Sequence, residues 1–356
     1  QNVFAFHSAK RVQVHIFALN PDDRSDYRRK IRSDVGEKYF FDFSTLSGVD
    51  AGRKVNQLKV HVLVDLVGYT GGGEKANEVF AVKPSPHAIS YMGFCFSTGA
   101  TYMDHMVVDR IVAPPEHQYQ FSEKMMVVPN SYFVADHQQS FMDVVEASAN
   151  ATKEEYGLPK GLIFACHNQL YKIDPKTYDV WMDVIRKVPD SSLWLLKFPD
   201  YAEPNIIKES KRRKVATNRL VFSQPVPKAK YMRRVSVADL FLDTPQVNAH
   251  TSATDALWAG LPMVTTPRQA IISRVASSLL LAGGHGELIA QTSSEYGALA
   301  LALSSTPSGR RKLQALRKKI EAARMMSPLF DTRLWVRNYD KAIMMAWEVM
   351  AIGAKP

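Results

Sequence analysis

Short apolar runs recur along the chain, and glycine, proline, asparagine or aspartate residues bound them. Such runs, separated by stretches of helical character, are typical of the strands of an α/β domain. Where the first run ends, Pro21, Asp22 and Asp23 predict the cap of a helix. In the first half of the chain the predicted strands cover residues 12–20, 60–67, 88–94, 106–108 and 125–128.

The same alternation is clearer in the second half of the chain. Asp174 followed by Pro175 predicts the cap and first position of a helix, and another helix is expected from about Thr251. Strands alternating with helices in this way predict a doubly wound parallel sheet. The predicted strands here cover residues 162–166, 193–196, 220–223, 238–243 and 263–266.

A polar stretch rich in alanine and serine, residues 138–153, separates the two halves. A chain of 356 residues is long enough for about two domains. We therefore predict a first lobe over residues 1–150 and a second lobe over residues 151–330. Residues 331–356 then form a C-terminal helical segment whose apolar face predicts packing back across the lobes.

The composition narrows the class of protein. Apolar residues make up 46% of the chain and charged residues 22%, and no apolar run approaches the ~18 residues of a membrane span. Cys95 and Cys166 are the only cysteines and lack metal-ligand spacing, which favours a reducing compartment, the cytoplasm or the nucleus. The net charge of +10 includes basic runs at 211–214 and 317–319 that resemble solvated helix faces, so a nucleic-acid partner is only a minor alternative.

The strongest local signal for chemistry is the segment from residue 238 to residue 266. An apolar strand ends at Asp243, and His250, Thr251 and Ser252 stand where the next helix begins, with Asp255 one turn further on. A helix N-terminus with free N–H groups binds phosphate, and a carboxylate at Asp255 could accept hydrogen bonds from ribose hydroxyls. The alternative is that these residues only cap the helix and stabilise its first turn.

Two further segments follow predicted strands and offer donors. Gln169 and Lys172 follow the first strand of the second lobe, where Lys172 either neutralises a diphosphate or is a solvated loop lysine. The third segment also follows a predicted strand, and it offers backbone groups and basic side chains at Val226, Pro227, Lys228, Arg233 and Arg234. The three segments converge on one edge of a parallel sheet, which favours a shared binding site.

Several longer motifs resemble the catalytic region of the eukaryotic protein O-GlcNAc transferases, including the plant, SECRET AGENT-like form. In the second lobe they are LDTPQVNAHTSATDALWAGLPMVT, NQLYKIDP, VPDSSLWLLKFPDYAEPNI, SRVASSLL and SPLFDT. In the first lobe they are VHVLVDLVGYT and KPSPHAISYMGFCFSTGATYMDHMVVD. The resemblance covers nearly the whole chain and is most specific between about residues 156 and 283.

The resemblance implies a GT-B glycosyltransferase with two Rossmann-like lobes and a cleft between them. It implies inverting transfer of N-acetylglucosamine from UDP-GlcNAc to Ser or Thr hydroxyls of intracellular proteins, with no metal and no cofactor. Gln169 and Lys172 would contact the diphosphate, with Lys172 stabilising the leaving UDP. His61 matches a family histidine and is a candidate catalytic residue, although its place at a strand start also suits a structural histidine.

The resemblance also assigns the rest of the donor site. His250, Thr251 and Ser252 would bind phosphate, and Asp255 would bind the ribose. The uracil and ribose would be held by Val226, Pro227, Lys228 and Arg234, with Tyr231 standing where better-known members have histidine.

This chain departs from the family pattern at the expected sugar pocket. The family loop GYPGTSG or GFPGTTG reads GFCFSTG here, with Cys95 and Phe96 in place of Pro-Gly. Family members carry a TPR array and a histidine-containing segment upstream, so the resemblance implies that this chain is a fragment.

Two other functions compete with O-GlcNAc transfer. One is protein O-fucosylation from GDP-fucose by a SPINDLY-type transferase, against which the sequence HTSATDALWAG at the helix start counts. The other is a nucleotide-sugar-binding scaffold that has lost turnover.

Overall fold

The structure, a computed structural model, describes residues 2–353 and divides the chain into two compact units. Unit 1 comprises the residues up to Asp136 together with those from Asp331 onward, and unit 2 comprises His137–Phe330. The first boundary therefore lies before the polar stretch at 138–153, and residues 137–150 belong to unit 2 rather than to the first lobe. The indole N–H of the buried Trp258 donates to the carbonyl of Phe141 at 3.0 Å, and this hydrogen bond holds the start of the polar stretch against unit 2.

Unit 1 contains a 4-stranded parallel sheet in the order β3-β4-β5-β6. A separate parallel pair, β1-β2, carries Phe17 and Phe41, whose rings stack at 5.5 Å, and Phe43 continues the stack. The strands are β1 (Ile16–Ala18), β2 (Phe40–Asp42), β3 (Val62–Asp65), β4 (His87–Ser90), β5 (His105–Val108) and β6 (Lys124–Val127).

The helices of unit 1 include α1 (Asp26–Val35), α2 (Gly48–Gln57) and α3 (Glu74–Ala81). The cap expected at residues 21–23 was wrong in position, because the side chain of Ser25 caps α1 by accepting from Arg28 N. Instead, the side chain of Asp22 accepts from the backbone N–H of Arg24 at 2.9 Å, and that of Asp23 accepts from the backbone N–H of Ser25 at 3.0 Å. They form the turn that precedes the helix.

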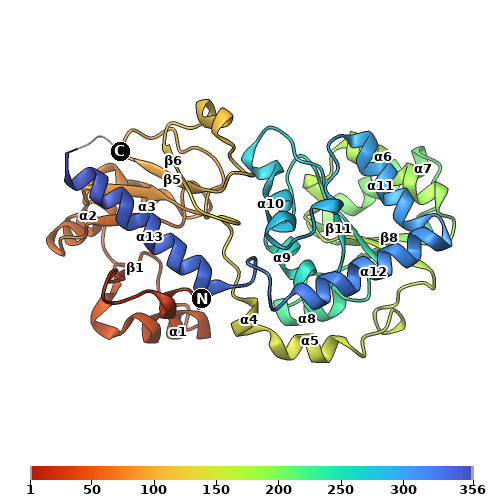
Figure 1. Cartoon of the computed structure of the whole chain (residues 1–356), viewed down its shortest axis with the longest axis horizontal. Helices are drawn as coiled ribbons and strands as arrows, with labels where there is room; N and C mark the ends of the chain where they lie inside the picture. The colour runs from red at the N-terminus through yellow and green to blue at the C-terminus, as the bar shows by residue number, and fades with distance from the viewer. Residues whose placement is uncertain (1, 354–356) are drawn as a thin grey trace. The chain divides into compact units, whose positions relative to one another are not determined.

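The C-terminal helix α13 (Thr332–Ala351) is part of unit 1. Figure 1 shows it as the dark blue helix beside the strands of that unit. Asp331 caps it by accepting from Leu334 N at 2.8 Å, and the Trp335 indole donates to the carbonyl of Ser131 at 3.1 Å. These contacts place the described part of the predicted C-terminal segment, residues 331–353, within unit 1.

The sheet of unit 2 has five parallel strands in the order β11-β10-β7-β8-β9. The chain runs outward from β7 to β9 and then returns to the other side of β7 at β10. This is the doubly wound arrangement that the sequence predicted, and its switch point lies between β7 and β10. The strands are β7 (Leu162–Cys166), β8 (Ser191–Leu196), β9 (Leu220–Ser223), β10 (Leu240–Leu242) and β11 (Met263–Val264).

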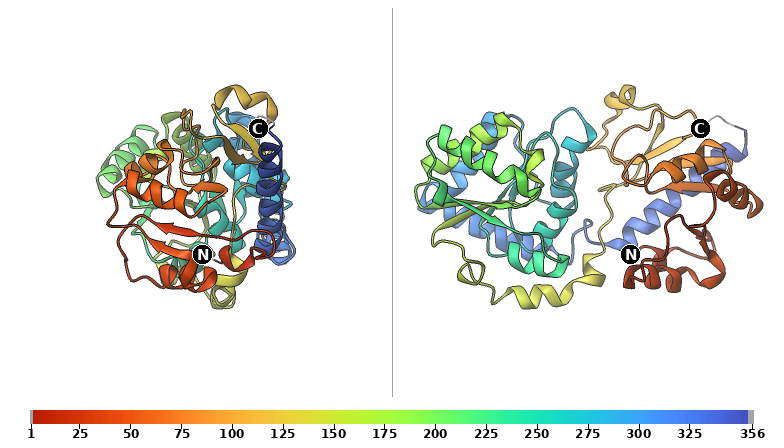
Figure 2. Two further views of the ribbon diagram at one scale, coloured as in Figure 1. Left: turned by 90° about the vertical axis from the view of Figure 1, so that its left-hand side faces the viewer. Right: turned by 180° about the vertical axis from the view of Figure 1, so that it is seen from behind.

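Helices cover both faces of this sheet. In Figure 1 α12 crosses in front of the sheet, and in the reverse view of Figure 2 the green helices α6 and α7 lie in front. None of the helices within residues 2–353 is long and apolar enough to cross a membrane. The helices of unit 2 are α4 (His137–Ser140), α5 (Met142–Ser148), α6 (Pro175–Lys187), α7 (Glu203–Arg212), α8 (Lys228–Val235), α9 (Thr251–Trp258), α10 (Val275–Ala282), α11 (Ser293–Ser304) and α12 (Pro307–Ala323).

The predicted cap of α6 gives a test of local stability. Asp174 accepts from the backbone N–H groups of Lys176 and Thr177, both at 3.1 Å. We expect Asp174→Ala to lower the free energy of unfolding by about 1–2 kcal/mol, measured as a lower urea midpoint. Lys176→Ala is the matched control because its side chain is exposed and takes no part in the cap. Equal midpoints for the two variants would contradict this role of Asp174.

Candidate functional site

Three segments meet at the switch point of the unit 2 sheet, beyond the carboxyl ends of β7 and β10. Asn168, just after β7, donates from Nδ2 to Thr244 Oγ1 at 2.6 Å and to Asp243 Oδ1 at 3.3 Å. Its Oδ1 accepts from Ser252 Oγ in the first turn of α9 at 3.0 Å. One buried amide therefore joins the end of β7, the end of β10 and the start of α9. Open α/β sheets bind their ligands at this position.

Asp243 holds the loop that connects β10 to α9. Its Oδ1 accepts from Ala249 N and its Oδ2 from Thr265 Oγ1, both at 2.7 Å. Burial raises the pKa of Asp243 to about 6, and the hydrogen bonds from Thr265 and Ala249 limit that rise. The loop is thus tied at both ends, which fixes where α9 begins.

The N-terminus of α9 presents free backbone donors. Ala253 N and Thr254 N donate to the carbonyl of His250, at 3.1 and 3.2 Å, and begin the helical bonding. Within residues 2–353, the preceding N–H groups of Thr251 and Ser252 have no hydrogen-bond partner. Thr251 is exposed and Ser252 is half-buried. Free N–H groups at the positive end of a helix dipole suit an anion.

Lys172 brings a positive charge to the same place. It ends a short 3-10 helix, Leu170–Lys172, that follows β7, and its Nζ lies 3.3 Å from the carbonyl oxygen of Asn248 in the loop before α9. Gln169 stands at the start of this turn, where its Oε1 accepts from the Tyr171 hydroxyl. The structure therefore brings Lys172 to the start of α9, as the pattern of strand ends predicted.

His250 contributes a neutral ring to this edge. Its Nε2 lies 3.2 Å from the carbonyl oxygen of Ile272, a hydrogen bond in which the ring nitrogen is the donor. Burial lowers the pKa of His250 to about 4, and the nearby charge of Lys172 lowers it further against the effect of that hydrogen bond. The positive charge at the start of α9 thus comes from Lys172 and the helix rather than from the imidazole.

Asp255 lies on α9 one turn from its start and is buried, at 4% exposure. Its Oδ1 accepts a hydrogen bond from His137 Nε2 at 2.7 Å and forms an ion pair with Lys228 Nζ at 3.1 Å. Lys228 also lies over the ring of Phe141 at 5.1 Å. The predicted neighbours Lys228 and Asp255 are therefore in direct contact across α8 and α9.

The other predicted residues around α8 fall into two groups. Val226 and Pro227 are exposed ahead of α8. Arg233 turns toward the segment after α5, where it pairs with Glu155 and donates to Tyr156 Oη at 2.6 Å. The structure therefore does not bring Arg233 to the start of α9.

Tyr231, which is half-buried, and Arg234, which is buried, lie beside the buried ring of His167. The rings of Tyr231 and His167 are 5.5 Å apart, and Arg234 lies over the Trp194 ring at 5.7 Å while donating to the Gln224 carbonyl at 2.8 Å. Among the described residues, neither the Tyr231 hydroxyl nor either His167 ring nitrogen has a hydrogen-bond partner. Burial lowers the pKa of His167 to about 3, so its ring is neutral.

His61 and the loop at the expected sugar pocket belong to unit 1. The exposed ring of His61 packs edge-on against Trp347 of α13, with centroids 4.6 Å apart. The loop GFCFSTG packs against the glycine-rich loop after β3, where Tyr69 Oη donates to the Thr98 carbonyl at 3.0 Å. A Cβ at Gly93 would stand 2.0 Å from the Leu66 carbonyl oxygen, so this approach requires glycine.

Sequence reasoning missed two residues that organise this edge, Asn168 and Asp243. Asp243 directly follows β10 and Asn168 is the second residue after β7, and a polar residue at a strand end is the signal that could have found them. The pattern shows a polar residue at a strand end but not the partner that it meets. Among residues 2–353, the side chains include no group of three or more His, Cys, Asp or Glu residues that could hold a metal ion.

Solved structures identify the class to which this fold belongs. The chain superposes on an O-GlcNAc transferase mutant from Thermobaculum terrenum with a TM-score of 0.83 and 22% identity, covering 98% of this chain and 65% of that chain. It superposes on Anabaena HepE, solved with UDP and glucose, with a TM-score of 0.58 and 12% identity. The match covers 97% of this chain and 94% of HepE. The fold is that of the GT-B glycosyltransferases.

Sequence comparison then narrows the class to one family. The profile of glycosyl transferase family 41 matches residues 1–153 and 143–339, and the chain belongs to this family.

Curated relatives agree with this family. The chain is 39% identical over 357 residues to the probable UDP-N-acetylglucosamine–peptide N-acetylglucosaminyltransferase SEC of Arabidopsis thaliana, covering 100% of this chain and 36% of that protein. It is 29% identical to the Caenorhabditis elegans UDP-N-acetylglucosamine–peptide N-acetylglucosaminyltransferase, covering 98% and 39%. It is 26% identical to a barley protein named SPINDLY, covering 85% and 31%. The chain spans less than two-fifths of the length of these relatives.

The lowered pKa of His250 gives a prediction for acid titration. The ordinary pKa is 6.5 and the folded value is about 4, so the unfolded chain binds more protons between these values. The stability that this group contributes is therefore complete above pH 6.5 and is lost as the pH falls through about 4. Proton NMR of the ring, assigned with His250→Gln, should show a midpoint near 4. A midpoint near 6.5 would contradict the buried, neutral ring.

Proposed function

We propose that this chain is the catalytic region of a protein O-GlcNAc transferase, which moves N-acetylglucosamine from UDP-GlcNAc to Ser or Thr hydroxyls of proteins. The observation that carries the proposal is the meeting of Lys172 with the free N-terminus of α9 at the switch point of the unit 2 sheet. This arrangement suits the diphosphate of a nucleotide sugar. The 39% identity to a plant protein named as such a transferase supports the choice of donor and reaction.

In this proposal the diphosphate binds against the first turn of α9. The N–H groups of Thr251 and Ser252 and their hydroxyls donate to phosphate oxygens. Lys172 lies next to them and supplies the positive charge, and Gln169 adds an amide donor from the turn before it. In this proposal Asn168 does not contact the nucleotide sugar itself. It keeps Ser252 in place by accepting a hydrogen bond from the Ser252 hydroxyl at 3.0 Å.

The nucleoside lies along α8. The exposed backbone of Val226 and Pro227 binds uracil, beside the half-buried Tyr231 and the buried Arg234. Asp255 binds the ribose hydroxyls, and its contact with Lys228 at 3.1 Å holds its carboxylate in place. Because Arg233 is engaged by Glu155, we assign it to the support of α8 rather than to the nucleotide.

The proposed reaction inverts the anomeric carbon. The acceptor oxygen forms a bond to this carbon as the bond to the β-phosphate oxygen breaks, and the electron pair leaves with UDP. Lys172 and the start of α9 stabilise the charge that develops on UDP, so we assign that role to the protein rather than to a metal. The hydroxyl proton passes to a base, for which His61 is the candidate that the family resemblance offers.

The partners follow from the same proposal. They are a UDP-sugar and Ser- or Thr-containing proteins of the cytoplasm and nucleus, with no nucleic acid and no membrane. Where a TPR array precedes such a catalytic region, as in the family that the sequence resembles, we expect that array to select the acceptors. Cys166 is buried and burial raises the pKa of its thiol, which keeps it protonated and suits a reducing compartment.

Calorimetry of this chain tests the donor site. We expect UDP and UDP-GlcNAc to bind and GDP not to bind, because the resemblance at the start of α9 favours uridine. Lys172→Met should weaken UDP binding about tenfold or more, the loss expected for one charge-assisted hydrogen bond. Lys176→Met is the matched control, since it removes an exposed lysine four residues further on. Binding of GDP instead of UDP would favour the fucosyltransferase alternative.

Transfer of labelled N-acetylglucosamine by the full-length protein tests turnover separately. Lys172→Met should lower kcat by roughly 10²–10³-fold, because its charge acts most strongly on the leaving UDP in the transition state. Lys176→Met should leave kcat unchanged. If UDP binds in calorimetry and the full-length protein shows no transfer, the chain is a nucleotide-sugar-binding scaffold and the transferase proposal fails.

A further inference from the structure

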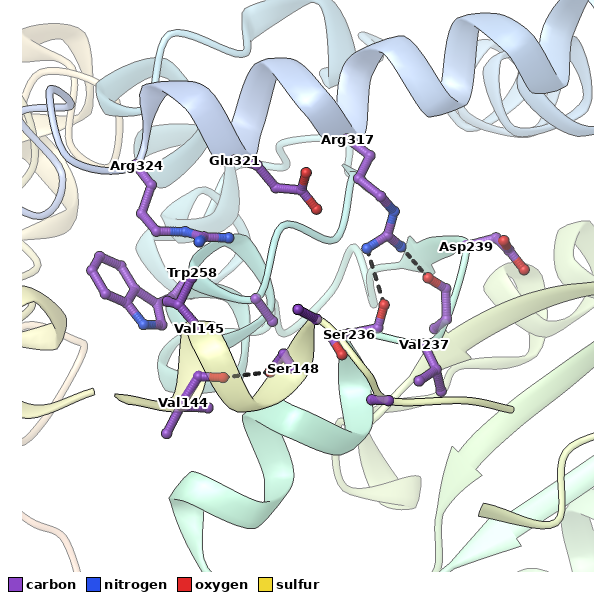
Figure 3. A pocket seen from close by; sticks show the side chains of 14 residues that line it. Val144, Val145, Ser148, Ser236, Val237, Asp239, Trp258, Arg317, Glu321 and Arg324 are labelled. Carbon is purple, nitrogen blue, oxygen red and sulfur yellow. Dashed lines mark hydrogen bonds between the residues drawn. The ribbon is translucent and has the colours of Figure 1, made fainter. Parts of the chain in front are cut away.

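A cavity of about 520 Å³ opens in unit 2 at the edge of the sheet opposite to the candidate site (Figure 3). Ala238 and Asp239, just before β10, form one side of it, and α5, α12 and the end of α9 form the others. The candidate site lies beyond the carboxyl end of β10, whereas this cavity lies at its amino end. A volume of this size is typical of pockets for small molecules.

Arg324, at the end of α12, points into this cavity (Figure 3). Its side chain lies over the ring of Trp258 at 5.5 Å, and the residue is only 9% exposed. In the part of the chain that the structure describes, its buried Nε has no hydrogen-bond partner. Burial lowers the pKa of Arg324, and the nearby carboxylate of Glu321 raises it by a smaller amount without forming a direct ion pair with this arginine. A buried N–H without an acceptor is costly, and an acceptor brought to this Nε by a ligand would remove that cost.

The second arginine of the cavity has a different role. Arg317, two turns earlier on α12, donates to the carbonyl of Ser236 at 3.0 Å and to that of Ala238. Its donors thus hold α12 against the loop before β10 and close one wall of the cavity. Arg324 is left as the guanidinium available to a ligand.

The charges around the cavity limit the ligand to a single negative charge. Glu321 lies between the two arginines on α12, is exposed, and has no ion pair among residues 2–353. Asp239 lies on the opposite side and pairs with Lys153 at 2.7 Å. Because Lys153 offsets the charge of Asp239, Glu321 is the carboxylate that would repel a doubly charged phosphate more strongly than a singly charged carboxylate.

The remaining walls favour an apolar body on the ligand. Val144 and Val145 of α5 and Val237 of the loop before β10 line the cavity together with the indole of Trp258. The nearby hydroxyls are already engaged, since Ser148 donates to the Val144 carbonyl at 2.6 Å. Apolar contact is what these surfaces offer.

We propose that this cavity is a second binding site, which takes a small organic acid with one carboxylate and an aliphatic or aromatic body. The carboxylate pairs with the guanidinium of Arg324, whose planar fork matches two carboxylate oxygens. The apolar body lies on the valine side chains of α5 and of the loop before β10. The site shares no side chain with the proposed donor site, so either can exist without the other.

Three matched probes test this site: 4-phenylbutyrate, the neutral 4-phenylbutanol and the dianionic phenethyl phosphate. We expect saturable binding of 4-phenylbutyrate at millimolar concentration and much weaker binding of the other two. The NMR signal of the Trp258 indole N–H, assigned with Trp258→Phe, should shift with the butyrate, because this ring lines the cavity. Equal binding of the alcohol, or no saturable shift with any probe, would overturn the proposal.

Two variants separate a binding role of Arg324 from a structural one. Arg324→Gln should weaken butyrate binding about tenfold or more, the loss of a charge-assisted pair. Glu321→Gln, at an exposed position that leaves the fold intact, should strengthen it roughly two- to fivefold by removing a like charge. Unchanged affinity in Glu321→Gln, or in a folded Arg324→Gln, would show that the carboxylate does not bind at this cavity.

Discussion

One buried side-chain amide, Asn168, connects the strand ends and the helix start that form the candidate site of unit 2. It contacts the end of β10 through Asp243 and Thr244 and the first turn of α9 through Ser252. Asn168, Asp243 and Thr244 are buried, so each of these polar groups needs a hydrogen-bond partner within the protein. The position of the helix N-terminus follows from this joint rather than from the helix itself.

The same joint explains why the charges at this edge are arranged as they are. Asp243 is buried with several donors directed at it, and Lys172 stands close enough to influence both its pKa and that of His250. Burial keeps the histidine neutral, so the lysine and the helix dipole supply the positive field. A preorganised field of this kind suits a leaving group that gains negative charge.

Much of this arrangement could be predicted from periodicity and turn chemistry. The strand over residues 220–223 coincides with β9, and Asp174 caps α6 as its place before Pro175 indicated. The three-residue strand β2 was missed because a run so short carries little periodicity. The domain boundary was placed late because the polar stretch at 138–153 reads as a linker, although Trp258 ties its start into unit 2.

The candidate site was predicted in part for a related reason. Strand ends indicate which segments meet at one edge, and that correctly brought Lys172 to the start of α9. They do not indicate where a long side chain turns, so Arg233 was included although Glu155 and Tyr156 hold it elsewhere. Nor do they show that His137 and Lys228 both reach Asp255, because these contacts join residues far apart in the sequence.

The place of α13 bears on how the chain folds as it is synthesised. Unit 2 is one continuous segment, so all of its strands and helices have been synthesised before α13 is made. Unit 1 is interrupted, and its Tyr91 ring packs against Trp335 and Tyr339 of that last described helix. The unit that begins first is therefore completed last, and until then the face that α13 covers is open to chaperones and to proteases.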